Sequence, residues 1–344
     1  MKRSYCTLFD KNYLYQGVAL YQSLVRHAGD FNLYVLCMDE ISYSLIESME
    51  LDNIIPLNVE DILTELLEEV RNRTTHSQFC WVCQPVICQF ILEHFKVDLI
   101  TYLESDSLFF SSPEPIFDEM GSNSVTLVPH NYSSEFDNSK TAGEFCVQFN
   151  AFKNDTTGLA VLEYWREWCF KYDKSAPFKY PGQTNLDDWP EKFENVAVIC
   201  NSGAGVAPWN VNGYELKLDN ITPQVNGLSV VFYHFHQYGR FSSGDHQLGN
   251  YPLSEDVIDL FYRPYVKALR DAENFVHAFD PDFSYRREYD STYIFSNVVR
   301  SLSVKSLKEY LSYIKDHIRG RYNIFPDSYF IKSEEANRLC SNKK

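Results

Sequence analysis

Apolar residues in the first 240 positions fall in short runs that alternate with amphipathic stretches. The runs predict strands at 4–9, 31–37, 54–57, 99–103, 125–129, 146–152 and 228–236. Apolar side chains at helical spacing predict helices at 12–24, 41–49, 59–71, 85–95 and 156–172. Because strands that alternate with helices form parallel sheets, this part of the chain predicts an α/β fold, a mostly parallel sheet flanked by helices.

The pattern changes near residue 250. Beyond Tyr251, helical segments follow one another without alternating strands, notably 257–272, which Pro264 is expected to interrupt, and 305–318. We therefore expect an α/β domain over 1–250 and a helical C-terminal extension over 251–344.

The charge and cysteine content narrow the classes of function and compartment. The 344 residues carry a net charge of −16, which repels phosphate polymers and makes a general nucleic-acid binder improbable. The nine cysteines are odd in number and widely spread, which favours a reducing compartment. No apolar stretch follows Lys2 and Arg3 as in a signal peptide, so we expect a cytoplasmic protein.

Two carboxylates close the apolar run 99–103. If the strand continues through them, its period of two places Glu104 and Asp106 on one face. Ligands of open α/β sheets bind at the carboxyl ends of strands, so such a pair is suited to hold Mg²⁺ or Mn²⁺ against a diphosphate. The alternative is that both are solvated loop residues.

Two histidines in the run 228–236 offer further ligands. His234 and His236 alternate onto one face of a strand, and a neutral imidazole can complete the coordination of a cation held by Asp106. The alternative is a pair of core histidines bonded to backbone or tyrosine groups.

Five segments in this order resemble a family of bacterial nucleotide-diphospho-sugar glycosyltransferases with a GT-A fold, distantly similar to family 8. They lie at 5–14, 102–115, 182–190, 203–210 and 233–236, and the match spans about residues 4 to 240. The resemblance implies a GT-A, Rossmann-like sheet and a metal-assisted transfer from a nucleotide diphosphate, most simply a UDP-sugar. It implies hexosyl or N-acetylhexosaminyl transfer to a glycan or lipid-linked glycan in surface polysaccharide synthesis.

The chain departs from that family at two acidic positions. The family's Asp-x-Asp metal motif matches Glu104 and Asp106, so the first carboxylate here is on a side chain one methylene longer. The family's Asp-Gln pair matches Gly182 and Gln183, so the carboxylate of that pair is absent at this position. Because of these departures, the alternative remains that the chain is a noncatalytic nucleotide- or glycan-binding protein with the same fold.

The resemblance also implies roles for residues near the donor sugar. In a retaining enzyme Gln183 lies near the sugar, whereas in an inverting enzyme Asp187 or Asp188 is the general base. We favour retention. The alternative for both aspartates is a structural charge at a helix start.

Donor contacts are expected at the carboxyl ends of the first strands. Arg73 is expected on the diphosphate, or in an ion pair with Glu68 or Glu69, and Trp209 is expected to stack on a sugar or to anchor its loop. The remaining expected nucleotide contacts are Thr7, Phe9, Asp10, Asn12, Asp39 and Ser105.

The C-terminal segment forms a separate hypothesis. Residues 300–344 carry ten basic and five acidic side chains with interleaved aromatics, as suits peripheral contact with an anionic membrane. The alternative is a solvated helix face packed on the first domain.

Overall fold

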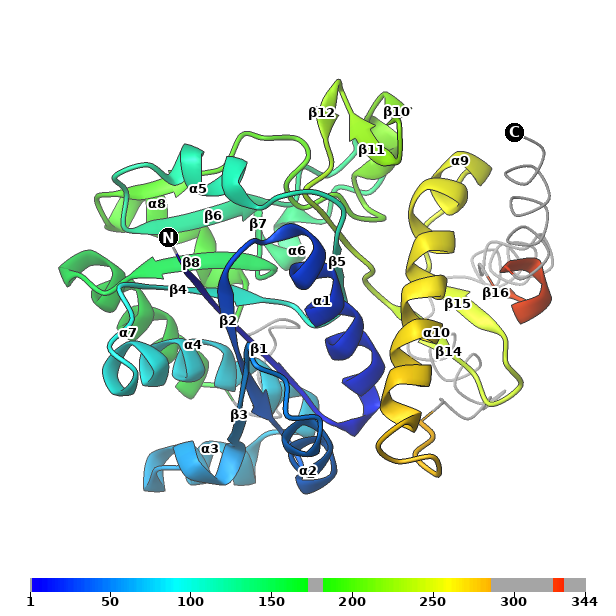
Figure 1. The fold of residues 1–344 in the computed structure, drawn as a ribbon. Helices are drawn as coiled ribbons and strands as arrows, with labels where there is room; N and C mark the ends of the chain where they lie inside the picture. The colour runs from blue at the N-terminus through cyan, green and yellow to red at the C-terminus, as the bar shows by residue number, and fades with distance from the viewer. Residues whose placement is uncertain (1, 173–181, 286–323, 331–344) are drawn as a thin grey trace, which may run out of the picture. The chain divides into compact units, whose positions relative to one another are not determined.

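The computed structural model describes residues 2–172, 182–285 and 324–330 (Figure 1). By its internal contacts the chain divides into two compact units. The first comprises 1–234 with 268–283, and the second comprises 235–267 with 284–344. The boundary expected at residue 250 falls inside the second unit, and its status as a domain limit stays a prediction.

The first unit is built on an eight-stranded mixed sheet with the order β3-β2-β1-β4-β8-β6-β7, in which β9 pairs with β6. Strands β1 to β4 are parallel, whereas β8 runs antiparallel to β4 and to β6. The strands are β1 (Arg3–Phe9), β2 (Phe31–Cys37), β3 (Ile54–Asn58), β4 (Leu99–Leu103), β6 (Val125–Pro129), β7 (Phe145–Cys146), β8 (Phe149–Lys153) and β9 (Val196–Val198). The predicted α/β fold with a mostly parallel sheet is confirmed.

Helices cover both faces of this sheet (Figure 1). They are α1 (Leu14–His27), α2 (Glu40–Ser48), α3 (Glu65–Arg73), α4 (His76–His94), α5 (Glu114–Met120), α6 (Ser139–Ala142), α7 (Thr156–Phe170) and α8 (Trp189–Lys192). Short 3-10 turns lie at η1 (Lys11–Tyr13), η2 (Val59–Ile62), η3 (Thr184–Asp188) and η4 (Val211–Gly213).

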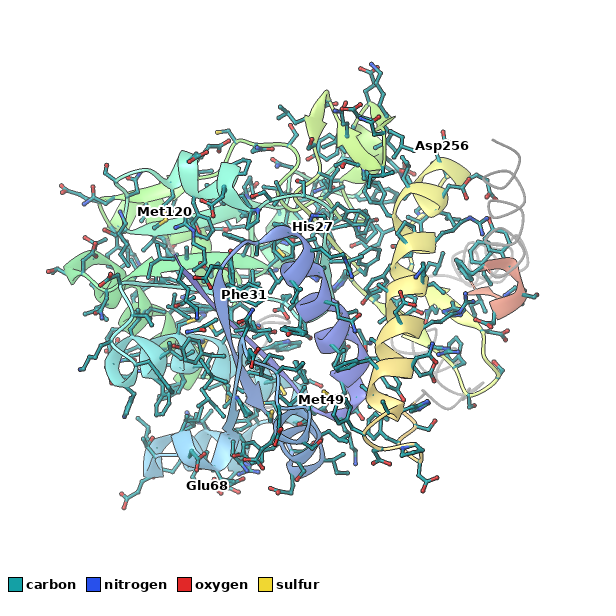
Figure 2. All side chains as sticks on the ribbon, viewed as in Figure 1. His27, Phe31, Met49, Glu68, Met120 and Asp256 are labelled. Atoms are coloured by element: carbon teal, nitrogen blue, oxygen red, sulfur yellow. The ribbon has the colours of Figure 1, made fainter. Side chains whose placement is uncertain are left out.

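The two faces of β1 show how the core is divided. Cys6 belongs to the apolar cluster formed with α4 and α7, whereas the ring of Phe9 lies against Gly17 of α1, where a β-carbon would come within 2.2 Å. In Figure 2, Phe31 and Met120 lie in the interior, and Glu68 lies on the outer side of α3. This alternation of sides along a strand is what buries the sheet between two helical layers.

Several predicted boundaries are wrong for local reasons. Helix α4 begins at His76, nine residues before Pro85, because Thr75 and Gln78 form a capping box; Pro85 lies inside the helix. The strand expected over 146–152 is split into β7 and β8. The strand expected over 228–236 is split into β12 (Leu228–Ser229) and β13 (Phe232–His234).

Two smaller sheets complete the first unit. The strands β10 (Leu216–Asp219), β11 (Thr222–Val225) and β12 form an antiparallel sheet. The strand β13 pairs antiparallel with β5 (Ser107–Phe109), which follows β4 after a three-residue turn.

The second unit contains a small antiparallel sheet of β14 (Tyr238–Arg240), β15 (His246–Leu248) and β16 (Ile324–Phe325). Its helical part runs from α9 (Glu255–Val257) through a π-helical turn at Ile258–Tyr262 into α10 (Arg263–His277), whose later residues belong to the first unit. The interruption expected at Pro264 does not occur: Pro264 is the second residue of α10, a position that tolerates proline, and the π-helical turn directly precedes that helix.

Within the three described ranges, no helix is long and apolar enough to cross a membrane. Of the C-terminal segment expected to contact a membrane, only 324–330 lies within the described residues.

Candidate active site

The acidic pair lies in a turn rather than on a strand. Strand β4 ends at Leu103, and the amide of Ser107 donates to the carbonyl of Glu104 at 3.2 Å, which closes a turn over Glu104, Ser105 and Asp106. The two carboxylates therefore do not share a strand face as expected from the period of two. The turn does lie at the carboxyl end of a central strand, where α/β sheets bind ligands.

The pairing of β5 with β13 brings a histidine to this turn. His234 is opposite Ser107 in the register, and its Nε2 lies 3.1 Å from Oδ1 of Asp106. The imidazole is 8% exposed and the Asp106 side chain is 18% exposed. Segments more than 120 residues apart in the sequence thus meet at one partly open position, as the sequence predicts for Asp106 and His234.

A buried amide fixes the other side of the His234 ring. Nδ1 lies 3.1 Å from Oε1 of Gln148, which is fully buried, and 3.9 Å from Sγ of Cys146. Each ring nitrogen thus lies within hydrogen-bonding distance of a side-chain oxygen. Burial lowers the pKa of His234, but the Asp106 carboxylate outweighs this and raises the pKa well above its ordinary value.

A glycine makes room for that amide. Gly205 has φ of +76°, and a β-carbon there would lie 2.4 Å from Nε2 of Gln148 and 2.7 Å from Cγ1 of Val128. No side chain fits without moving Gln148, so the close approach of the loop 201–210 depends on glycine.

The carboxylate of Glu104 is held elsewhere. Its Oε1 accepts a 2.8 Å hydrogen bond from Nε2 of Gln84 in α4. Burial and the nearby Asp106 carboxylate raise the pKa of Glu104 to about 8. Among the residues that the structure describes, no three or more His, Cys, Asp and Glu side chains form a group that could hold a metal ion.

His236 is not on a strand with His234. Strand β13 ends at His234, and His236 lies in the turn before β14, in the second unit. The expectation that alternation places both imidazoles on one face is therefore wrong, and a ligand role of His236 stays a prediction.

Trp209 lies in the wall of the site. It is 3% exposed, its indole N–H donates to the carbonyl of His130 at 2.9 Å, and its ring meets the His234 ring edge-on at 5.3 Å. This matches the anchoring alternative: the indole restricts the orientation of His234 and offers no open platform for stacking.

Two of the residues expected near the donor sugar, Gln183 and Asp187, are hydrogen-bonded to backbone groups of the segment 142–147. Gln183 donates to the carbonyl of Ala142 at 2.7 Å and accepts from the amide of Val147 at 3.3 Å. Asp187 accepts from the amides of Glu144 and Phe145 at 2.8 and 3.3 Å.

The two aspartates differ in their electrostatic surroundings. Burial raises the pKa of Asp187, whereas hydrogen bonds from Lys192 and Tyr164 lower the pKa of Asp188. Both carboxylates therefore have partners within the fold, but neither side chain caps the start of α8, and their roles stay predictions.

A second polar cluster lies at the ends of β1 and β2. Asp10 accepts from the amide and side chain of Asn12 and lies 2.9 Å from Nε2 of His76. Asp39 accepts from the amides of Lys11 and Ser42. Three of the expected nucleotide contacts, Asp10, Asn12 and Asp39, are therefore close together.

The other expected nucleotide contacts are placed differently. Thr7 and Phe9 are in the core, at 0% and 3% exposure, and Ser105 is buried within the acidic turn. Arg73 donates to the carbonyl of Phe170, and its expected contact with the diphosphate stays a prediction.

Sequence reasoning did not identify His76, Gln84 and Gln148. Gln84 and Gln148 are polar residues within apolar runs, which is the signal that could have identified them. His76 follows the capping residue Thr75 and has no such signal.

No protein-family model matches the chain. The chain is similar to two uncharacterised proteins of Bacillus subtilis (strain 168). It is 28% identical to YfnF over 83% of this chain and 97% of that protein, and 26% identical to YfnD over 81% and 93%.

Solved structures resemble the fold at low sequence identity. The galactosyltransferase LgtC, solved with donor and acceptor sugar analogues, has a TM-score of 0.53 at 13% identity, covering 78% of this chain and 95% of that chain. An active-site mutant of LgtC has a TM-score of 0.50 at 14% identity, with the same coverage. The fold of this chain is therefore of the GT-A type.

Proposed function

We propose that this protein is a glycosyltransferase that moves a hexosyl or N-acetylhexosaminyl group from a nucleotide-diphosphate sugar to a glycan or lipid-linked glycan. The donor that we favour is a UDP-sugar. The observation that carries the proposal is the Asp106–His234 pair, with N and O 3.1 Å apart at the carboxyl end of β4. On a GT-A sheet, this edge is where a ligand binds. A role in bacterial surface polysaccharide synthesis accords with the family resemblance.

The pair fits a divalent cation. The Asp106 carboxylate and the neutral form of the His234 imidazole would hold Mn²⁺ or Mg²⁺, because both side chains are metal ligands and their Oδ1 and Nε2 atoms lie 3.1 Å apart. When bound, the ion neutralises charge that develops on a diphosphate leaving group. Asp106 and His234 would hold it, Gln148 keeps the imidazole oriented, and diphosphate oxygens would supply further ligands.

The cluster at β1 and β2 is assigned to the nucleoside. Asp10 is 8% exposed and paired with His76, whose side chain is 56% exposed. The Asp39 carboxylate fixes the start of α2 and the amide of Lys11. These groups offer both donors and acceptors to ribose hydroxyls and a base.

Retention of configuration is favoured by the engagement of the two candidate bases. An inverting enzyme needs a carboxylate free to take the proton of an acceptor hydroxyl. Asp187 instead accepts two backbone amides, and Asp188 is paired with Lys192. Gln183, whose amide joins two loop segments beside them, is the polar side chain assigned to the sugar face.

The first test is binding. A thermal-shift screen of UDP-, GDP-, CMP- and dTDP-sugars with and without Mn²⁺ should show a metal-dependent rise in melting temperature with one nucleotide class.

The second test is turnover of the donor found in that screen. Asp106→Asn should lower Mn²⁺-dependent hydrolysis or transfer by at least about 100-fold, since loss of an outer-shell partner alone costs about 10- to 100-fold. The matched control is Asp98→Asn, an exposed aspartate before the amino end of the same strand. Equal activity of the two variants would refute the site, and binding without turnover would favour the noncatalytic alternative.

A further inference from the structure

The Glu104 carboxylate is hydrogen-bonded by Tyr102, near the end of the preceding strand, and by Gln84, which comes from a different element. Gln84 lies in α4, is 3% exposed, and its Nε2 is 2.8 Å from Oε1 of Glu104 and 3.3 Å from the hydroxyl of Tyr102. A buried amide has a large desolvation cost unless it is hydrogen-bonded. Its bonds to Glu104 and Tyr102 therefore stabilise one position of the carboxylate.

The backbone at residue 182 leaves space beside this amide. A β-carbon on Gly182 would lie 3.4 Å from Oε1 of Gln84, 3.5 Å from Nε1 of Trp165 and 3.6 Å from Sγ of Cys169. A single methyl group is accommodated there, but a longer polar side chain would extend among these three groups. Glycine at this position thus leaves the Gln84 amide available to Glu104.

The hydrogen bonding of Glu104 explains why the candidate cation site has only two protein ligands, Asp106 and His234, among the described residues. Glu104 is two residues from Asp106, yet the described part of the chain contains no group of three His, Cys, Asp and Glu side chains able to hold a metal. Within the turn closed by Ser107, the Glu104 carboxylate accepts from Gln84 of α4, whereas the Asp106 carboxylate lies against His234.

We propose, on the basis of the proposed function, that Gln84 is a positioning residue that keeps Glu104 out of the cation site. Asp106 and His234 are then the ligands that the acidic turn and β13 supply. Glu104 acts as a fixed acceptor beside the site rather than as a third ligand.

The test is a double-mutant cycle in Mn²⁺ affinity, measured by electron paramagnetic resonance with UDP as the second ligand. Gln84→Met, which keeps the side-chain length and removes the amide, should release Glu104 toward the ion and tighten Mn²⁺ binding about tenfold, the lower range of outer-shell effects. The same change in the Glu104→Gln background should leave the affinity unaltered. Gln89→Met is the matched control, because Gln89 on the same helix donates to Glu93 in a similar amide–carboxylate pair at 2.9 Å.

A second variant keeps the proposal testable if Gln84→Met folds poorly. Glu104→Gln alone should change Mn²⁺ affinity by less than about tenfold, whereas Asp106→Asn should lose more. Equal losses in these two variants, or a Gln84→Met effect that persists without the Glu104 carboxylate, would overturn the positioning role. Failure of Mn²⁺ to bind the wild-type protein would overturn the proposed function as well, so the two failures are distinguishable.

Discussion

Substitution of Gly205 by alanine tests whether the loop 201–210 and Gln148 together fix the imidazole of His234. At φ of +76°, any L-residue has a backbone cost of about 1–2 kcal/mol. The new methyl group also lies 2.4 Å from Nε2 of Gln148, and overpacking of this kind costs about 1–3 kcal/mol more. We therefore expect Gly205→Ala to lower the free energy of unfolding by about 2–5 kcal/mol in all.

The matched control is Gly227→Ala. Gly227 has nearly the same φ, +80°, but no atom lies within 4 Å of a β-carbon there, so this variant carries the backbone cost alone. Urea unfolding should show the larger loss for Gly205→Ala, and donor hydrolysis should fall in that variant while it stays near wild type in Gly227→Ala. Equal losses of stability and activity in the two variants would refute the packing of Gln148 on residue 205.

Three further predictions concern pH, packing and the candidate base. His76→Gln should lower the melting temperature near pH 6 and much less above pH 10. The hydrogen bond to Asp10 raises the pKa of His76 to about 10. The stabilisation from the charged imidazole is therefore complete below the pKa of the unfolded chain, about 6.5, and is lost as the pH rises through 10. Trp165→Phe should lower the free energy of unfolding in urea by about 1–3 kcal/mol, because the indole N–H no longer meets the Gly182 carbonyl at 2.6 Å. Asp187→Asn should keep the rate of sugar transfer within about tenfold, since an amide oxygen still accepts the two backbone N–H groups, whereas loss of a general base costs about 10²–10⁴ in rate.

The order of strands and helices was predictable because it depends on local periodicity. The apolar runs at β1, β2 and β4 are long enough to identify a sheet, and the side chains just after them mark its carboxyl edge. The boundaries that failed depend on single residues: Thr75 starts α4 early through a capping box. Such hydrogen bonds leave the hydrophobic pattern unchanged and are not visible in it.

The residue types of the site and the approach of His234 to Asp106 were predictable, but the way in which the chain brings them together was not. Their contact requires the β5–β13 pairing between distant segments, which composition and periodicity do not specify. The predicted side-chain directions of Glu104 and His236 were wrong because each residue lies in a turn and not in a strand. Side chains alternate between faces only where the backbone stays extended.

The buried amides explain why the acidic turn alone is an incomplete description of this site. Gln148 faces Nδ1 of His234, and Gln84 faces Glu104, so these two titratable side chains near Asp106 each have a neutral amide partner. An amide adds no charge, so it orients an imidazole or a carboxylate without competing for a cation. Two glycines, at 182 and 205, leave the space for these amides. The geometry of the proposed active site thus depends as much on these two glycines as on the residues that would bind a donor.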